Sequence, residues 1–192
     1  MKLLEEKIKS EGRVLPGNIL KVDHFLNHQI DTALFMEMGK DFAEHFANSG
    51  ITKVFTLEVS GIAVAFAAAH YLGVPVVFAK KTESATLGDE VYTSKVYSYT
   101  KKKEYSIRVD KKFLTTEDKV LLIDDFLAVG QALGGMLDVC AQSGADVVGI
   151  GIAIEKVFQG GGDKYRAMGY DVYSQARIAS FTDDSVIFEN AE

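Results

Sequence analysis

Residues 120–133 read VLLIDDFLAVGQAL, and this stretch decides the fold. It opens with a continuous apolar run, which is typical of a strand buried on both faces of a parallel sheet. Two acids, Asp124 and Asp125, follow the run, and a turn of small residues then leads into a helical pattern. The order of strand, turn and helix predicts an α/β unit.

The segments on either side repeat this order. Helices are predicted over 31–50, 61–73 and 130–144, the first with Asp31 as its cap and Gly50 as its stop. Strands are predicted over 53–58, 75–80, 119–124 and 146–156. This alternation predicts a twisted parallel sheet with flanking helices, within a single domain over residues 1–192.

The acid pair and the turn after it predict the chemistry. Ligands of such folds bind beyond the carboxyl ends of the strands, where carboxylates can accept hydrogen bonds from sugar hydroxyls. The next helix begins close by, and its free N–H groups can hold a phosphate. The candidate phosphate turn consists of Ala128, Val129, Gly130, Gln131 and Ala132. We therefore expect a sugar phosphate, with Mg²⁺ or the neutral sugar separating acids from phosphate.

Adjacent side chains of a strand point to opposite faces. Both acids can therefore reach one ribose only if the chain turns at Asp125. Other phosphate sites fit less well, because the sequence has no GxxxxGK[ST] motif and no GxGxxG after its first strand. The glycine-rich stretch FQGGGDKY, residues 158–165, is predicted to be a flexible loop.

Residues 81–110 are polar and alternate like an antiparallel hairpin. Two interpretations stay open for this segment. It is either a solvated hairpin at the edge of the sheet or a mobile flap over the ligand site.

The composition narrows the class of protein. The net charge of −6 argues against a general nucleic-acid surface, and no segment has the length and apolarity of a signal peptide or membrane span. The single cysteine, Cys140, fits a buried position in a reducing compartment, so we expect a cytoplasmic protein with neither nucleic-acid nor membrane partners. The four histidines lack metal-ligand spacing, so no metal site made of protein side chains is predicted. They are His24, His28, His45 and His70.

The stretch VLLIDDFLAVGQA resembles the 5-phosphoribosyl 1-pyrophosphate signature of the type I phosphoribosyltransferases. Many members carry Thr or Ser at the middle of Ala-x-Gly, where this chain has Val129, so a hydroxyl donor to the phosphate is missing. The resemblance extends to GRVLPGNILKVDHFLNHQID, VPVVFAKK and GIGIAIEK, which are similar to the family's bacterial purine-salvage members that use xanthine. It implies the type I fold, with a small N-terminal hood and a flexible hairpin flap.

The resemblance also implies a reaction, in which xanthine and phosphoribosyl pyrophosphate give XMP and pyrophosphate. It implies bound Mg²⁺ and a homodimer. Asp124 and Asp125 would be the catalytic pair, holding the ribose hydroxyls and favouring a cationic ring. The implied pyrophosphate contacts are the backbone N–H groups of Glu58, Val59, Ser60 and Gly61 and the side chain of Lys81. Ser60 as a simple helix cap and Lys81 as a solvent-facing lysine are the alternatives.

Three residues are candidates for the purine pocket. Lys156 ends a strand beside the expected ribose site, and its donors suit an oxygen at purine C6 and disfavour adenine. Asn27 can donate to O2 of xanthine and accept from N3–H. By resemblance Leu20 packs on the base plane, although a plain core position explains it equally well.

Two rival functions remain at the level of the sequence. The chain could be another purine phosphoribosyltransferase, for guanine and hypoxanthine. It could also be a regulator that keeps the fold and binds phosphoribosyl pyrophosphate as a signal. The first thirty or so residues are too few and too weakly basic for a winged-helix DNA-binding domain, which argues against a repressor.

Overall fold

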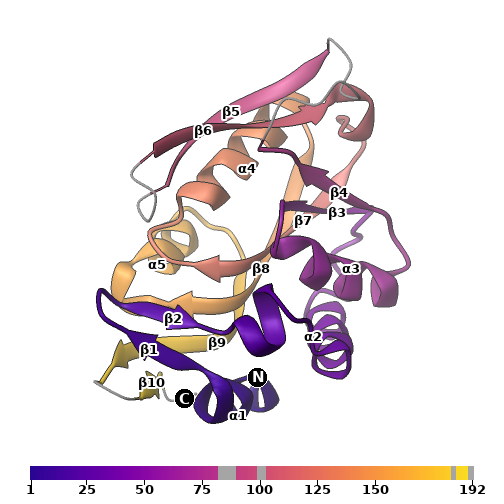
Figure 1. Ribbon diagram of the computed structural model, residues 1–192. Helices are drawn as coiled ribbons and strands as arrows, with labels where there is room; N and C mark the ends of the chain where they lie inside the picture. Colours follow the sequence, from indigo (N-terminus) through magenta and orange to yellow (C-terminus); the bar gives the residue numbers. More distant parts are fainter. Residues whose placement is uncertain (82–89, 99–102, 183–184, 190–192) are drawn as a thin grey trace.

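The computed structural model describes residues 1–81, 90–98, 103–182 and 185–189. Among these residues the central sheet has the strand order β10-β9-β8-β7-β3-β4, and all neighbours are parallel except β10 and β9 (Figure 1). The strands are β3 (Lys53–Leu57), β4 (Val76–Ala79), β7 (Lys119–Leu127), β8 (Asp146–Lys156), β9 (Val172–Phe181) and β10 (Val186–Phe188). The predicted parallel sheet is confirmed, with an antiparallel strand added at one edge.

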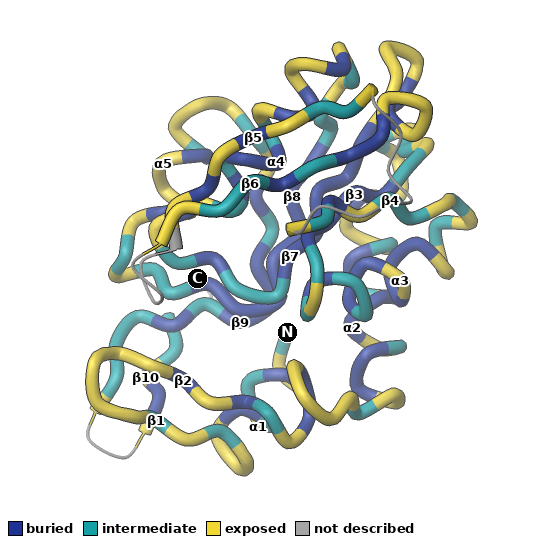
Figure 2. The backbone as a smooth tube through the Cα atoms, turned by 45° about the horizontal axis from the view of Figure 1, so that its top comes forward, coloured by how far each residue is buried: buried dark blue, intermediate teal, exposed yellow. Residues whose placement is uncertain are grey.

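Helices cover both faces of the sheet (Figure 1). One apolar core joins the sheet to α1 (Lys2–Glu11), α2 (Thr32–His45) and α3 (Gly61–Leu72). The other core joins it to α4 (Gln131–Ser143) and α5 (Gly161–Ala167). Figure 2 shows that the deeply buried backbone runs through the central strands β7 and β8. The apolar run of β7 is therefore buried on both faces, as predicted.

Short local signals set the ends of the helices. Asp31 caps α2, because its carboxylate accepts a hydrogen bond from the Leu34 N–H at 3.1 Å. Gly73 ends α3 in the left-handed conformation, with φ of 70°. The prediction that α2 runs to Gly50 is wrong: the helix ends at His45, and the poor helix formers Asn48 and Ser49 follow in a turn.

The predicted N-terminal hood is present. It consists of α1, the antiparallel pair β1 (Arg13–Leu15) and β2 (Ile19–Lys21), and a short π-helix over Asp23–Asn27. Its buried side chains, among them Leu4, Ile8 and Phe25, join the core on the side of β9 and β10. The hood thus lies beside the end of the sheet that carries β9 and β10.

The predicted hairpin is also present, as β5 (Val91–Ser98) paired antiparallel with β6 (Lys103–Asp110). Val96 and Ile107 are buried against α4, where a Cβ on Gly135 would lie 2.5 Å from Val96. A backbone bridge between Lys80 and Arg108 links the hairpin to the residue after β4. Residues 82–89 and 99–102 of the predicted flap lie outside the described residues, so its motion stays a prediction.

The glycine-rich stretch is not the flexible loop that its composition predicts. It forms a 3₁₀ turn over Val157–Gln159 and then α5, and Gly161 and Gly162 are buried. A Cβ on Gly162 would lie 1.8 Å from the Glu155 carboxylate, so the glycine allows α5 to pack closely on β8.

The position of the single cysteine and the length of the apolar helices bear on two expectations from composition. Cys140 is buried in α4, as predicted, and burial raises the pKa of its thiol to about 12. No helix in the described part of the chain has the length and apolarity to cross a bilayer.

Candidate active site

The acid pair lies in a cleft of about 250 Å³ beyond the carboxyl ends of β3 and β7. The turn at Asp125 that would let both acids reach one ribose is absent: β7 continues through Asp125 to Leu127, with Phe126 opposite Ile154 of β8. Both acids nevertheless line the same cleft, and the Asp125 N–H donates to the Asp124 carboxylate at 3.0 Å. The two acids therefore share one cleft without a break in the strand.

The cleft disfavours two negative charges. Burial raises the pKa of the Asp124 carboxyl well above its ordinary value, and the charge of Asp125 adds to the rise. Burial also raises the pKa of Asp125, against the opposite effect of its hydrogen bonds. A cation, or a ligand that donates hydrogen bonds, would favour the ionised pair because it offsets this cost.

The phosphate turn lies directly after β7, as predicted. Residues 128–132 line a second cleft of about 200 Å³, which shares Tyr105, Phe126 and Ala132 with the cleft of the acid pair. Gly130 has φ of 84° and lies at the N-cap of α4, a backbone conformation that favours glycine. The first N–H groups of a helix have no partner within it, so the turn offers donors although Val129 carries no hydroxyl.

The predicted pyrophosphate loop lines the same cleft as the acid pair. Leu57, Glu58, Val59 and Ser60 belong to its lining, and Gly61 begins α3. Ser60 occupies the N-cap of α3 without a side-chain cap bond in the described structure, which argues against a capping role alone.

One donor of this loop differs from the prediction. The backbone N–H of Glu58 does not face the cleft as a free donor, because it donates to the Ala79 carbonyl of β4 at 3.1 Å. The Glu58 side chain instead accepts a hydrogen bond from the Lys81 N–H.

Gly61 brings the loop against the acid pair. A Cβ at this position would lie 2.3 Å from the Thr56 hydroxyl and 3.1 Å from the Asp124 carboxylate. The absence of a side chain therefore allows the start of α3 to approach the carboxylate closely.

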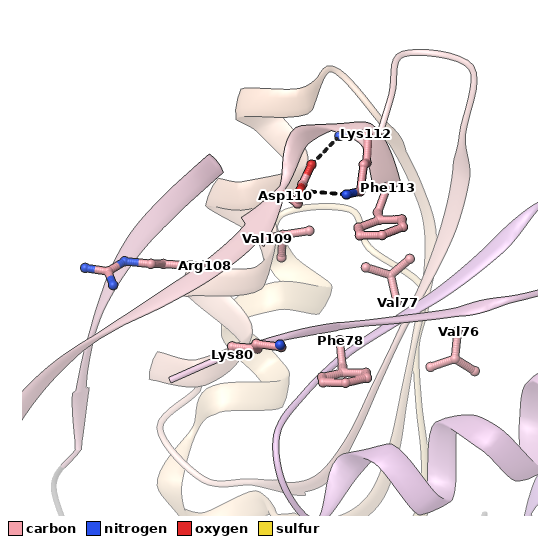
Figure 3. A pocket seen from close by; sticks show the side chains of 9 residues that line it. All are labelled: Val76, Val77, Phe78, Lys80, Arg108, Val109, Asp110, Lys112 and Phe113. Atoms are coloured by element: carbon pink, nitrogen blue, oxygen red, sulfur yellow. Dashed lines mark hydrogen bonds and ion pairs between the residues drawn. The ribbon is translucent and has the colours of Figure 1, made fainter. Parts of the chain in front are cut away.

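Lys81 lines the cleft, and its ammonium lies 5.4 Å from the ring centroid of Tyr105 on the hairpin. Its neighbour Lys80 instead lines a separate cleft of about 350 Å³ beside the edge strand β4 (Figure 3). In this separate cleft beside β4, Lys112 pairs with Asp110 at 3.1 Å. The chain thus directs Lys81, and not Lys80, towards the acid pair.

Lys156 ends β8 close to this site. Its ammonium lies 5.7 Å from the ring centroid of Phe126, the residue that follows Asp125, and 5.8 Å from that of Phe181. It donates to the Asn18 carbonyl of the hood at 2.8 Å, and burial lowers its pKa. A base bound here can replace the Asn18 carbonyl as the acceptor.

The other two base candidates belong to the hood. Leu20 lies on β2, is 6% exposed and packs in the core, so the structure agrees with the plain core interpretation in the free protein. Asn27 ends the short π-helix and is exposed. Asn18, two residues before Leu20, links the hood to Lys156. The roles of Leu20 and Asn27 in binding the base stay predictions.

Sequence reasoning missed three aromatic residues of the site. Phe126 lines both clefts and lies under Lys156, and Tyr105 lines both clefts from the hairpin. Burial, and then the charge of Asp124, raise the pKa of the Tyr105 hydroxyl. Phe181 faces Lys156 from the end of β9. Phe126 could have been predicted as a site residue from the sequence, since it lies inside the acid motif. The other two residues come from distant segments.

Comparisons with known proteins agree with this geometry. The phosphoribosyl transferase domain family matches residues 22–182. A xanthine phosphoribosyltransferase of Finegoldia magna is 56% identical over 99% of this chain and 100% of its own length. Another, from Listeria innocua, is 58% identical and covers both chains completely.

Solved structures share the fold. An adenine phosphoribosyltransferase from Rhodothermus marinus superimposes with a TM-score of 0.73 at 22% identity, over 93% of this chain and 100% of that one. At this identity the likeness concerns the fold alone. Together with the family match and the full-length relatives, it completes the assignment: the chain belongs to the phosphoribosyltransferase family.

Proposed function

We propose that this enzyme transfers the 5-phosphoribosyl group of phosphoribosyl pyrophosphate to N9 of xanthine, giving XMP and pyrophosphate. The observation that carries the proposal is the joined pair of clefts, in which one acid pair lies between a phosphate turn and a second anion-binding loop. The relatives named xanthine phosphoribosyltransferase, at 56% and 58% identity over the whole chain, support the choice of base.

The acid pair acts on the sugar. In the transfer the bond from C1 of the ribose to the pyrophosphate oxygen breaks, and its electron pair leaves with pyrophosphate. The N9 lone pair of the base forms the new bond to C1, and the N9 proton is lost. Positive charge builds on the ribose, and Asp124 and Asp125 stabilise it while they hold the hydroxyls.

The leaving group is held by the loop after β3. The N–H groups of Val59, Ser60 and Gly61 lie at the start of α3, where the helix favours an anion. The ammonium of Lys81 adds a positive charge on the same cleft. This arrangement stabilises the negative charge that develops on pyrophosphate.

The purine base is recognised by hydrogen-bond donors of the protein. Lys156 donates to the oxygen at C6 and is held over the ring of Phe126, beside the acid pair. Asn27 donates to O2 and accepts from N3–H. An amino group at C6 would leave the Lys156 donor without an acceptor, which disfavours adenine.

The acid cleft also suits a magnesium ion that arrives with the substrate. Mg²⁺ is commonly held by one or two carboxylates and by substrate phosphates, and the raised pKa values of Asp124 and Asp125 indicate that the pair gains from a cation. The described residues contain no cluster of three or more ligating side chains, so substrate oxygens would complete the shell. When bound, Mg²⁺ would supply charge neutralisation for pyrophosphate.

We also propose a homodimer, working in the cytoplasm. An apolar groove of about 500 Å³ runs over α2 and α3, and Phe66 and Val59 on it are 63% and 76% exposed. Such a patch is typical of a protein interface. Light scattering should give twice the mass of one chain, and Phe66→Glu should reduce it to one chain. The buried Cys140 thiol suits a reducing compartment.

The activity is tested by incubating the protein with Mg²⁺, labelled phosphoribosyl pyrophosphate and one purine at a time. Xanthine should give labelled XMP at the highest kcat/KM, with adenine inactive. Preferred turnover of guanine or hypoxanthine would contradict the base assignment. Binding of phosphoribosyl pyrophosphate without turnover of any base would favour the regulator.

A further inference from the structure

The glycine-rich segment after Lys156 packs against the back of the phosphate turn. The Gly161 N–H donates to the Ala128 carbonyl at 3.1 Å, and the buried Tyr165 hydroxyl donates to the Gly130 carbonyl at 2.7 Å. The Gly130 carbonyl also accepts the first helical bond of α4, from the Gly134 N–H at 2.9 Å. Two of the carbonyls of the turn are therefore bound on the side of α5.

The planar peptide bond relates these carbonyl contacts to the direction of the N–H groups of the turn. A trans peptide is planar, and its N–H points opposite to its C=O. The Ala128 carbonyl shares a peptide with the Val129 N–H, and the Gly130 carbonyl shares one with the Gln131 N–H. Holding both carbonyls against α5 consequently directs the N–H groups of Val129 and Gln131 away from α5, on the side open to a ligand.

The contact leaves no room for a side chain at Gly130 or Gly161. A Cβ on Gly130 would lie 2.6 Å from the Tyr165 ring, and a Cβ on Gly161 would lie 2.2 Å from the Ala128 carbonyl oxygen. The Tyr165 side chain is 2% exposed and belongs to the core. The turn is thus closely packed from behind by α5.

The segment is itself anchored to the strand of the base lysine. Arg166 donates to both oxygens of Glu155, at 2.8 and 2.6 Å, and Ser174 also donates to this carboxylate. Burial alone would raise the pKa of Glu155, but the hydrogen bonds and charge of Arg166 hold it below its ordinary value. Glu155 directly precedes Lys156, so α5 connects the phosphate turn with the base site.

We infer that Tyr165 is a positioning residue that orients the backbone donors of the phosphate turn, with Gly161 as its partner in this role. It contacts the turn and not the substrate. The inference rests on the proposed function, because it takes the turn to hold the 5′-phosphate. It also explains how a turn without the Thr or Ser hydroxyl keeps its donors in place: their direction is set by α5.

The test is Tyr165→Phe, which removes the hydroxyl and keeps the ring. We expect the KM for phosphoribosyl pyrophosphate to rise about three- to tenfold, the range for one neutral hydrogen bond, with the KM for xanthine within about twofold of wild type. Calorimetry should give a similar loss of affinity for ribose 5-phosphate, which has the same 5′-phosphate and undergoes no reaction.

Tyr173→Phe is the matched control. Its hydroxyl donates to Asp41 at 2.9 Å, and Tyr173 packs on the core of the other sheet face, so the variant loses a tyrosine hydrogen bond at least as strong on the opposite face from the turn. Both KM values of this variant should stay at the wild-type level. An unchanged KM for phosphoribosyl pyrophosphate in Tyr165→Phe, or an equal rise in both KM values, would overturn the inference. Wild-type enzyme is assayed alongside, because its failure to form XMP would refute the proposed function instead.

Discussion

The proposed sugar-phosphate half of the site and the proposed base half are built differently. The phosphate turn follows the acid pair in the same stretch of chain, and two hydrogen bonds from α5 hold it from behind. The base half is assembled from the hood, the end of β8 and the end of β9, and one hydrogen bond from Lys156 to Asn18 joins the hood to β8. One half is local and hydrogen-bonded from behind, and the other is composed of distant parts.

This difference separates two tasks of the enzyme. Every substrate pair brings the same ribose and phosphate, so the machinery that stabilises the charged sugar profits from a fixed geometry. The choice of base depends on a few donors and acceptors that distant segments supply. Changes in the first half should therefore affect the rate with any base, and changes in the second should affect one substrate.

The largest effect is expected at the acid pair. Asp125→Asn removes the charge that stabilises the cationic ribose, so kcat should fall about a hundredfold, with every base that the enzyme accepts. Steady-state assays with saturating substrates check this. Asp146→Asn, an exposed acid at the start of β8, is the matched control and should keep the wild-type kcat. A kcat of Asp125→Asn close to wild type would remove the carboxylate from the mechanism.

The next effect concerns the base lysine. Lys156→Ala should raise the KM for xanthine about tenfold to a hundredfold, because a charged hydrogen bond to the base is lost. The KM for phosphoribosyl pyrophosphate should hardly change. Lys40→Ala, on the exposed face of α2, serves as the control. An equal loss for both substrates would mean that Lys156 supports the whole site and that the two halves are not separate.

A smaller effect is expected at the hood. Asn27→Ala should lower the preference for xanthine over hypoxanthine about three- to tenfold, because hypoxanthine lacks the C2 oxygen that the amide would bind. The measurement is the ratio of kcat/KM for the two bases. Asn48→Ala, after α2, changes an exposed asparagine elsewhere and should leave the ratio as it is. An unchanged ratio in Asn27→Ala would place the C2 contact on another residue.

The smallest effect concerns stability. The folded-state pKa of Asp124 is raised, so the folded protein binds more protons at this site than the unfolded chain does. Its contribution to stability is present below the unfolded pKa of about 3.9 and is lost as the pH rises through the folded pKa. Asp124→Asn removes this loss and should stabilise the free protein by about 1 kcal/mol at pH 8.

Thermal or urea unfolding of wild type and Asp124→Asn, from pH 3.5 to pH 8, measures this difference. The gain should shrink as the pH falls and vanish near pH 3.5. A variant that is less stable than wild type at pH 8 would contradict the cost assigned to the buried pair.

The local half of the site could be predicted from the sequence because its signals are local. The apolar run, the acids and the small-residue turn occur together, and the structure puts the acids and the turn on joined clefts. The exact course of the strand was less predictable, since both acids line one cleft although β7 runs through Asp125 without a turn.

The remaining errors have tertiary causes. Nothing near Glu58 indicates that its N–H is used by Ala79 of a neighbouring strand. Three consecutive glycines are typical of a flexible loop, yet here two of them, Gly161 and Gly162, allow close contact with Ala128 and Glu155, which lie on other elements. Tyr105 and Phe181 reach the site only through the pairing of the hairpin and the order of the sheet.

The buried thiol of Cys140 has a practical consequence for kinetics. With its pKa raised to about 12, it is almost never a thiolate at neutral pH, and thiolates are the species that alkylating dyes attack. A cysteine placed on the hairpin, for example Lys95→Cys at a side chain that is 74% exposed, would therefore accept a fluorophore selectively. Stopped-flow fluorescence could then time the hairpin during turnover without first removing the native sulfur.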